Sequence, residues 1–194
     1  MNPQSPPRLP VTAALVIIDV QQAIDNPCWA EHGPRNNPAA EDTMATLLAA
    51  WRQAGRPVFH IRHESTEPDS TYRPGQAGCD FKACVLPAAG ETVLAKSAHS
   101  AFIGTGLEER LRAGGIDTLV IFGVITNNSV EATVRMAGNL GFAAWLVEDA
   151  CFTFARPDYR GRLCSADEIH AMSLANLDGE YCRVVTAGEL LPHI

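Results

Sequence analysis

Short apolar runs alternate with amphipathic segments along almost the whole chain, and this alternation strongly limits the possible folds. The run at 13–18 (AALVII) is apolar at every position, which is typical of a strand buried on both faces of a parallel sheet. Four further runs predict strands at 57–62, 118–123, 143–147 and 182–186. Amphipathic segments predict helices at about 41–54, 105–113, 128–139 and 165–176. We therefore expect an α/β fold, a three-layer doubly wound sheet that is mostly parallel and has helices on both faces.

Capping signals support the helix boundaries. Ser165 is followed three residues later by Glu168, the spacing of a capping box, and Thr105 is a candidate N-cap. Gly55 follows the first predicted helix, where a glycine commonly ends one.

Length and composition indicate one globular domain without nucleic-acid or membrane partners. The chain has 194 residues and a net charge of −7, which disfavours binding to phosphate backbones. Residues 1–10 are polar and proline-rich, so we expect a flexible N-terminal arm before a single domain at 11–194. No apolar run approaches the roughly 18 residues needed to cross a bilayer, and no secretory signal is evident. The sequence thus predicts a cytoplasmic protein whose six irregularly spaced cysteines are free thiols.

Polar residues follow several of the predicted strands. They lie at Asp19, 62–64, 123–128 and 148–149. Because ligands bind beyond the carboxyl ends of parallel strands, we expect these segments to gather at one edge of the sheet. The stretch 64–95 is rich in Pro, Gly and Asp, and it predicts a loop that covers or shapes this edge.

Three residues are candidates for chemistry. Asp19 ends an apolar strand, where burial would raise the pKa of a carboxyl group unless a cation lies close. Lys96 is one of only two lysines, and it is the candidate partner. Ser129 falls in the first turn of the helix after 118–123, where free backbone N–H groups favour an anion. Each also has an ordinary structural explanation: a turn aspartate, a surface lysine and a helix-start serine.

Three stretches of the chain resemble the isochorismatase-like cysteine hydrolases. They are ALVIIDVQ, the segment from AKSAHSAF through IDTLVIFGVITNNSVEATVRMAGNLGF, and VEDA. That superfamily includes nicotinamidases, carbamoyl-amide hydrolases, other amidases and isochorismatases. The similarity runs from about Ala13 to Ala150, with weaker agreement to Val185.

The resemblance implies a catalytic set of Asp, Lys and Cys. Asp19 matches the aspartate that takes the thiol proton, and Lys96 matches the lysine that keeps this aspartate ionised. Family members carry a cis peptide bond that maps here to Val124–Ile125. The resemblance further implies an oxyanion hole formed by the backbone N–H groups of Ile125 and Ser129.

Ser129 departs from the family pattern, because the amidases have cysteine at this position. A hydroxyl is a much poorer nucleophile than a thiol without a strong adjacent base. Three interpretations follow. The serine replaces a natural cysteine and blocks an amidase, or the protein is an isochorismatase-type vinyl-ether hydrolase that uses Asp19 without a thiol. In the third interpretation the protein is a ligand-binding relative without catalysis.

The remaining expectations concern the pocket and the partners. Trp29 and Phe102 are candidate apolar walls by analogy, and candidate polar contacts are Arg62, His63, Glu64 and Asn128. The segment HIRHES at 60–65 lacks the Asp-x-His pair of metal-binding members, so we expect no metal. We expect no cofactor, a small-molecule amide as substrate, and a homo-oligomer, either a dimer or a tetramer.

Overall fold

A six-stranded parallel sheet forms the centre of the computed structural model, which describes residues 9–194. The strand order is β3-β2-β1-β4-β5-β8, and every neighbouring pair is parallel. The strands are β1 Ala14–Ile18, β2 Val58–His63, β3 Thr92–Lys96, β4 Thr118–Val124, β5 Ala143–Phe152 and β8 Arg183–Val185. The predicted parallel α/β fold is confirmed.

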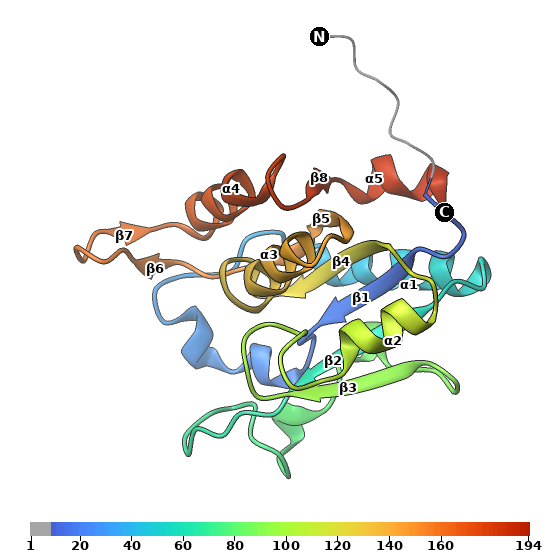
Figure 1. Ribbon diagram of the computed structural model, residues 1–194. Helices are drawn as coiled ribbons and strands as arrows, with labels where there is room; N and C mark the ends of the chain where they lie inside the picture. The colour runs from blue at the N-terminus through green and yellow to red at the C-terminus, as the bar shows by residue number, and fades with distance from the viewer. Residues whose placement is uncertain (1–8) are drawn as a thin grey trace, which may run out of the picture.

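Helices cover both faces of this sheet. They are α1 Ala40–Gln53, α2 Leu107–Ala113, α3 Glu131–Asn139, α4 Ala166–Leu177 and α5 Ala187–Leu190. Figure 1 shows α2 and α3 in front of the sheet and α1 behind it, which gives the three predicted layers. The antiparallel hairpin of β6 Arg156–Pro157 and β7 Leu163–Cys164 extends from one end of the molecule. Short helical turns complete the fold: η1 Gln22–Asp25, η2 Pro27–Ala30, η3 Ala77–Cys79, η4 Ala83–Val85, η5 Thr126–Val130 and η6 Leu191–His193.

The core explains why the central strands are continuously apolar. All five residues of β1 and all seven residues of β4 are buried, because helices cover both faces of these two strands. Trp51 of α1 is fully buried and donates a hydrogen bond from its indole nitrogen to the Pro57 carbonyl at 3.0 Å. Each fully buried large apolar side chain contributes about 1.5–3 kcal/mol. Strands β1 and β4 thus form a rigid base for the segments that follow them.

The segment predicted as a loop at 64–95 is corrected at its end, where Thr92–Lys96 forms β3 at the edge of the sheet. Val93 and Ala95 are exposed while Leu94 and Lys96 are buried. This alternation is what an edge strand covered on one face shows, so no continuous apolar run marks it. The helix predicted from about 128 also differs, because the π-type turn η5 at Thr126–Val130 precedes α3.

The predicted N-terminal arm falls mostly outside the described residues. Of its last two residues, Leu9 is buried in the core and Pro10 is exposed. None of the helices between residues 9 and 194 is long and apolar enough to cross a membrane.

Candidate functional site

The winding of the sheet reverses between β1 and β4. From β1 the chain continues outward to β2 and β3, and from β4 it continues in the other direction to β5 and β8. Open parallel sheets bind ligands beyond the carboxyl ends of the strands at such a switch point. Asp19 directly follows β1, and η5 with Ser129 follows β4. Lys96 is the last residue of β3, two strands away from β1.

The backbones of β1 and β4 approach each other closely at the switch point. Gly123 in β4 has a φ of 143°, and a Cβ atom there would lie 2.1 Å from the Ile18 carbonyl oxygen. Only glycine fits this position. Asp19 has a left-handed φ of 53°, and its N–H still donates to the Ile61 carbonyl at 3.0 Å. The Asp19 carboxylate is therefore fixed at the edge of the sheet.

The three predicted catalytic residues lie together. Lys96 Nζ donates to Asp19 Oδ2 at 2.7 Å and lies 3.3 Å from Ser129 Oγ. It also donates to the Ala98 carbonyl at 3.1 Å. Asp19 and Lys96 are each 3 % exposed and Ser129 is 7 % exposed. The ammonium of Lys96 thus bridges the carboxylate and the hydroxyl in a largely dry site.

Asp19 combines burial with an incomplete set of hydrogen bonds. Burial raises the pKa of its carboxyl group, and the Lys96 ammonium opposes this shift. Oδ2 is held by Lys96, whereas Oδ1 is buried and has no hydrogen-bond partner among the described residues. A carboxylate with one anchored oxygen and one free oxygen can accept or deliver a proton without losing its position.

His63, a predicted pocket residue, borders this ion pair. Its Nδ1 lies 3.3 Å from Lys96 Nζ. Burial, followed by the charges of Lys96 and His99, lowers the pKa of His63 to about 4, so the imidazole is neutral at pH 7. Neutral Nδ1 can accept a hydrogen bond from the ammonium.

Gln21 holds His63 in place and has no role in the sequence-based expectations. Its side-chain Oε1 accepts from the His63 N–H at 2.7 Å, and its Nε2 donates to the carbonyls of His63 and Cys79 at 3.0 and 2.9 Å. Gln21 is fully buried. The signal in the sequence that could have indicated Gln21 is its position, two residues after Asp19 at the end of an apolar strand.

The turn η5 follows directly from β4. The Val124–Ile125 peptide bond is cis, at the position to which the family resemblance points. Asn128 is exposed and its N–H donates to the Ile125 carbonyl at 3.1 Å. Asn127 Oδ1 accepts from Thr153 Oγ1 at 2.6 Å, which ties the turn to the end of β5.

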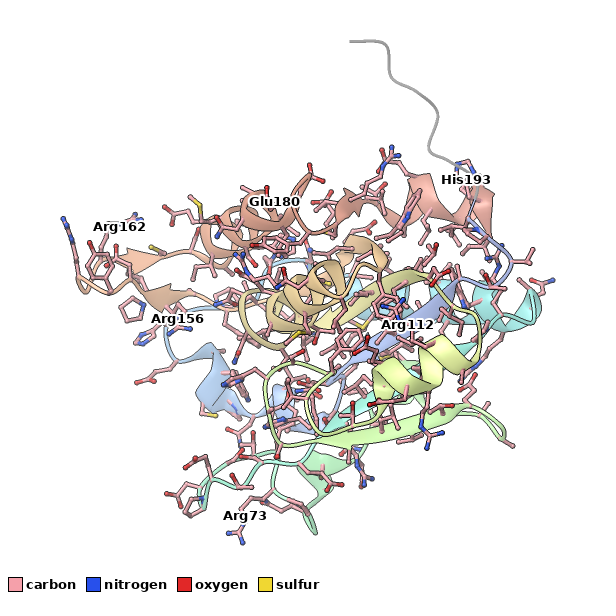
Figure 2. All side chains as sticks on the ribbon, viewed as in Figure 1. Arg73, Arg112, Arg156, Arg162, Glu180 and His193 are labelled. Atoms are coloured by element: carbon pink, nitrogen blue, oxygen red, sulfur yellow. The ribbon has the colours of Figure 1, made fainter. Side chains whose placement is uncertain are left out.

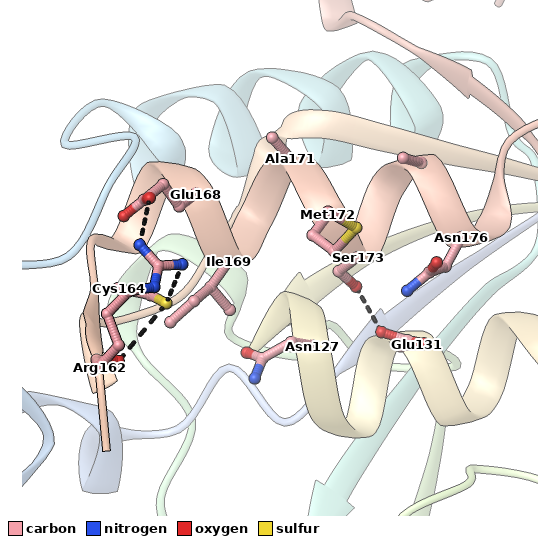
Figure 3. Close-up of a pocket in the computed structure, with 11 residues that line it drawn as sticks. Asn127, Glu131, Arg162, Cys164, Glu168, Ile169, Ala171, Met172, Ser173 and Asn176 are labelled. Atoms are coloured by element: carbon pink, nitrogen blue, oxygen red, sulfur yellow. Dashed lines mark hydrogen bonds and ion pairs between the residues drawn. The ribbon is translucent and has the colours of Figure 1, made fainter. Parts of the chain in front are cut away.

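Trp29 lines a cavity of about 330 Å³ that reaches Ile125. Its ring lies 6.2 Å from Phe154 and 6.1 Å, edge-on, from Tyr72. The rim carries the charged or titratable residues Glu31, His32 and Arg156. Arg156 belongs to β6, and Figure 2 shows it at the base of the β6–β7 hairpin. A larger cavity of about 500 Å³ lies along α4 (Figure 3). None of the three catalytic candidates lines either cavity, and the smaller one approaches them through Ile125.

Other predicted site residues lie elsewhere. Arg62 and Glu64 form an ion pair with each other and line a separate cavity of about 440 Å³. The Phe102 ring stacks on Phe142 with centroids 5.7 Å apart, and Phe142 precedes β5 at the edge of the sheet opposite to Asp19. The loop after β3 carries Phe102 into this packing, and Phe102 does not line the cavity that Trp29 lines.

The acidic pair predicted at a strand end also serves the fold. Glu148 and Asp149 lie inside β5, which is longer than predicted. Asp149 Oδ1 accepts from the Ala187 N–H at 2.8 Å, at the first residue of α5. Asp149 thus supports the C-terminal segment of the chain.

The two histidines of HIRHES lie three residues apart on β2, so they point to opposite faces of the sheet. His60 is fully buried and its Nε2 contacts Glu91 Oε2 at 2.8 Å, while His63 faces Lys96. In residues 9–194, no group of three or more His, Cys, Asp or Glu side chains is arranged to hold a metal ion.

Comparison with known proteins identifies the family of this chain. The isochorismatase domain family matches residues 13–189. The chain belongs to the isochorismatase family. A putative isochorismatase-family hydrolase from Chromobacterium violaceum, known from a crystal structure, shares 60% sequence identity with this chain. The two structures match with a TM-score of 0.92 over 97% of both chains. The uncharacterized isochorismatase family protein YrdC of Bacillus subtilis is 40% identical over 92% of this chain and 94% of its own length.

Two relatives of this isochorismatase-family chain carry names that state an activity. Streptothricin hydrolase of Streptomyces noursei is 31% identical over 93% of this chain and 64% of its own length. Maleamate amidohydrolase of Pseudomonas putida is 28% identical over 93% of this chain and 86% of its own length. The family thus includes hydrolases, and some of its members are amidohydrolases.

Proposed function

We propose that this protein hydrolyses a C–N bond in a small non-peptide amide, ureide or lactam through Asp19, Lys96 and the nucleophile position 129. One observation carries the proposal. Lys96 anchors Asp19 Oδ2 and contacts Ser129 Oγ, which leaves Asp19 Oδ1 buried and free to exchange a proton. A structural ion pair has no need of that free oxygen.

The proposed mechanism applies to a chain with cysteine at position 129. Asp19 takes the thiol proton, and the thiolate attacks the carbonyl carbon of the substrate. The backbone N–H groups of Ile125 and residue 129 stabilise the oxyanion. Asp19 then delivers the proton to the leaving nitrogen as the C–N bond breaks. Water, deprotonated by Asp19, hydrolyses the thioester and restores the thiol.

Serine at position 129 is expected to block this cycle. A serine hydroxyl ionises at far higher pH than a thiol, and Asp19 beside an ammonium is a weak base for it. Ser129 Oγ accepts from Lys96, and the interaction of its hydroxyl with Asp19 lowers the pKa of that carboxyl group, which makes Asp19 a weaker base for the hydroxyl. We therefore expect the chain to bind substrate and to turn it over slowly or not at all.

The relatives and the cavity support a small amide. One relative is named for a hydrolase of streptothricin and another for an amidohydrolase of maleamate. The 330 Å³ cavity next to Ile125 has aromatic walls at Trp29 and Phe154, and it is near the lower limit for small-molecule sites. A compact substrate with an apolar portion fits this space.

The raised pKa of Asp19 favours a second candidate function. A carboxyl group that holds its proton can act as a general acid and protonate a vinyl ether, which water then attacks. This isochorismatase-type reaction needs no thiol, so Ser129 would not block it.

The test is ammonia release from a panel of small primary amides and ureides, measured for the parent chain and for Ser129→Cys. We expect the cysteine variant to turn over at least one compound that the parent does not. Ser97→Cys is the matched control, because Ser97 is exposed beside Lys96 and adds a thiol outside the site.

Each other outcome contradicts the amide proposal in a specific way. Loss of a vinyl ether in the parent chain, with no ammonia from either form, supports the isochorismatase-type reaction. Binding of panel compounds without any turnover in either form supports a ligand-binding protein.

A further inference from the structure

Helix α4 holds the turn that carries position 129. His170 Nδ1 lies 2.9 Å from Thr126 Oγ1, and Ser173 Oγ lies 3.3 Å from the Thr126 carbonyl oxygen. Thr126 is fully buried, and the two α4 residues are 7 % and 3 % exposed. The hydroxyl and the carbonyl of Thr126 therefore both face side chains of α4, a helix distant in sequence.

Ser173 also links this contact to α3. Its Oγ donates to Glu131 Oε2 at 2.6 Å, as Figure 3 shows. Glu131 Oε1 in turn accepts from Arg135 at 2.7 Å. The single hydroxyl proton of Ser173 favours the shorter contact with the carboxylate, so His170 is the stronger anchor of Thr126.

Two hydrogen bonds from outside α4 also reach the turn, from Thr153 Oγ1 to Asn127 Oδ1 at 2.6 Å and from Thr133 Oγ1 to the Ser129 carbonyl at 2.7 Å, but neither holds the Thr126 side chain at its start. Neither η5 nor the start of α3 has a capping hydrogen bond from a side chain at its N-cap position. His170 is specialised for the Thr126 contact, because its Nε2 is buried and has no hydrogen-bond partner among the described residues. Burial also lowers the pKa of His170, which keeps the imidazole neutral.

We propose that His170 and Ser173 are positioning residues that set the turn Thr126–Val130 so that the side chain at position 129 faces Lys96. They act through Thr126 and do not contact the reacting atoms. The inference rests on the proposed function in one respect, because it takes position 129 as the nucleophile. It adds that α4, outside the site of Asp19 and Lys96, controls how well a nucleophile there is activated.

A thiol at position 129 reports this geometry directly. In S129C the sulfur replaces Ser129 Oγ, which lies 3.3 Å from the Lys96 ammonium. A nearby cation lowers the pKa of a thiol, so a turn that shifts away from Lys96 raises it. Alkylation by iodoacetamide, followed across pH and resolved by peptide mass spectrometry, measures that pKa without any substrate.

The experiment compares His170→Leu, His170→Asn and Ser165→Ala, each in the S129C background. Leu removes the hydrogen bond, whereas the Asn amide retains a polar atom near the position of Nδ1. We expect His170→Leu to slow alkylation at pH 7 about tenfold, because a thiol whose pKa is about one higher carries about a tenth of the thiolate. His170→Asn should restore most of the rate.

Ser165→Ala separates positioning from stability. Ser165 caps the same helix by accepting from the Glu168 N–H at 3.2 Å, and it has no hydrogen bond to η5. This variant should lower the thermal midpoint and leave the thiol pKa unchanged. An unchanged thiol pKa in His170→Leu, or an equal rise in Ser165→Ala, would overturn the proposal.

If His170→Leu does not fold, Thr126→Val in the S129C background carries the test, because it removes the hydroxyl that His170 Nδ1 contacts and keeps the side-chain shape. A rise in the thiol pKa supports the proposal and an unchanged value overturns it. Failure of the amide panel leaves these measurements intact, so the two proposals can fail separately.

Discussion

Two carboxylates at opposite ends of the strands show how hydrogen bonding and burial set the pKa of a carboxyl group. Glu91 lies just before β3, and donors occupy both of its oxygens. Arg52 donates to them at 2.7 and 2.8 Å, the Ala88 N–H donates at 2.8 Å, and His60 Nε2 lies at 2.8 Å. These contacts, chiefly that of Arg52, lower the pKa of Glu91 to about 2.

Asp19, at the carboxyl end of the central strand β1, has one hydrogen-bonded charged partner, Lys96, and its Oδ1 has no hydrogen-bond partner among the described residues. Burial dominates, and the pKa of Asp19 is raised. The comparison indicates that saturating a carboxylate with donors makes it a fixed anion, whereas partial saturation in a dry site makes it a proton carrier. The following predictions test this difference, from the largest expected effect to the smallest.

The largest effect is expected on catalysis. In the S129C chain, Asp19→Asn should lower kcat for an accepted amide by up to about 10⁴-fold, because proton transfer in both half-reactions is lost. Glu91→Gln is the matched control, and it should leave kcat within about twofold because Glu91 lies at the opposite end of the strands. Steady-state kinetics decide the matter. Equal losses in the two variants would remove the functional distinction between these carboxylates.

The Asp19 side of this contrast could be predicted from the sequence, whereas the Glu91 side could not, and the reasons are physical. Asp19 and Lys96 were predictable because the resemblance supplied their pairing and because Asp19 ends an unbroken apolar strand. Edge strand β3 was not predictable, since its burial alternates and its segment is rich in loop residues. Gln21 and His170 act through tertiary hydrogen bonds across 42 and 44 positions, and no local periodicity encodes such contacts.

Stability gives the second test of the comparison. Lys96→Met leaves the Asp19 carboxylate buried without its cation, and the free energy of unfolding at pH 7 should fall by about 3–5 kcal/mol. Lys82→Met is the matched control. This second lysine pairs with the largely exposed Asp25 and with the partly buried Glu41, and Glu41 keeps Arg35 as a partner, so the loss should be only about 1 kcal/mol. Urea unfolding measures both losses.

A double variant shows whether the loss arises from the unpaired charge. Asp19→Asn combined with Lys96→Met removes both charges and should be more stable than Lys96→Met alone. If the double variant loses the sum of the two single effects, the ion pair is not the cause.

The smallest effect concerns acid stability, where the two carboxyls should act in opposite directions. The folded-state pKa of Glu91 is about 2, below its ordinary value of 4.5, so its contribution is present above pH 4.5 and is lost as the pH falls toward 2. Glu91→Gln removes that contribution, about 1–3 kcal/mol, and should flatten the loss of stability in this window. Asp19 has a raised pKa, so its protonation relieves a penalty and stabilises the fold as the pH falls.

The measurement is urea unfolding of the parent and Glu91→Gln from pH 5 downward. The lowered pKa of His63 also makes the fold less stable as the pH falls from 6.5 to about 4, but this contribution is common to both chains and cancels in their difference. His60 contacts Glu91 and would not cancel, so both chains carry His60→Asn in this comparison. The two stability curves should therefore converge as the pH falls. Parallel curves would mean that the hydrogen bonds to Glu91 do not favour its ionised form, and the distinction between a fixed anion and a proton carrier would then rest on Asp19 alone.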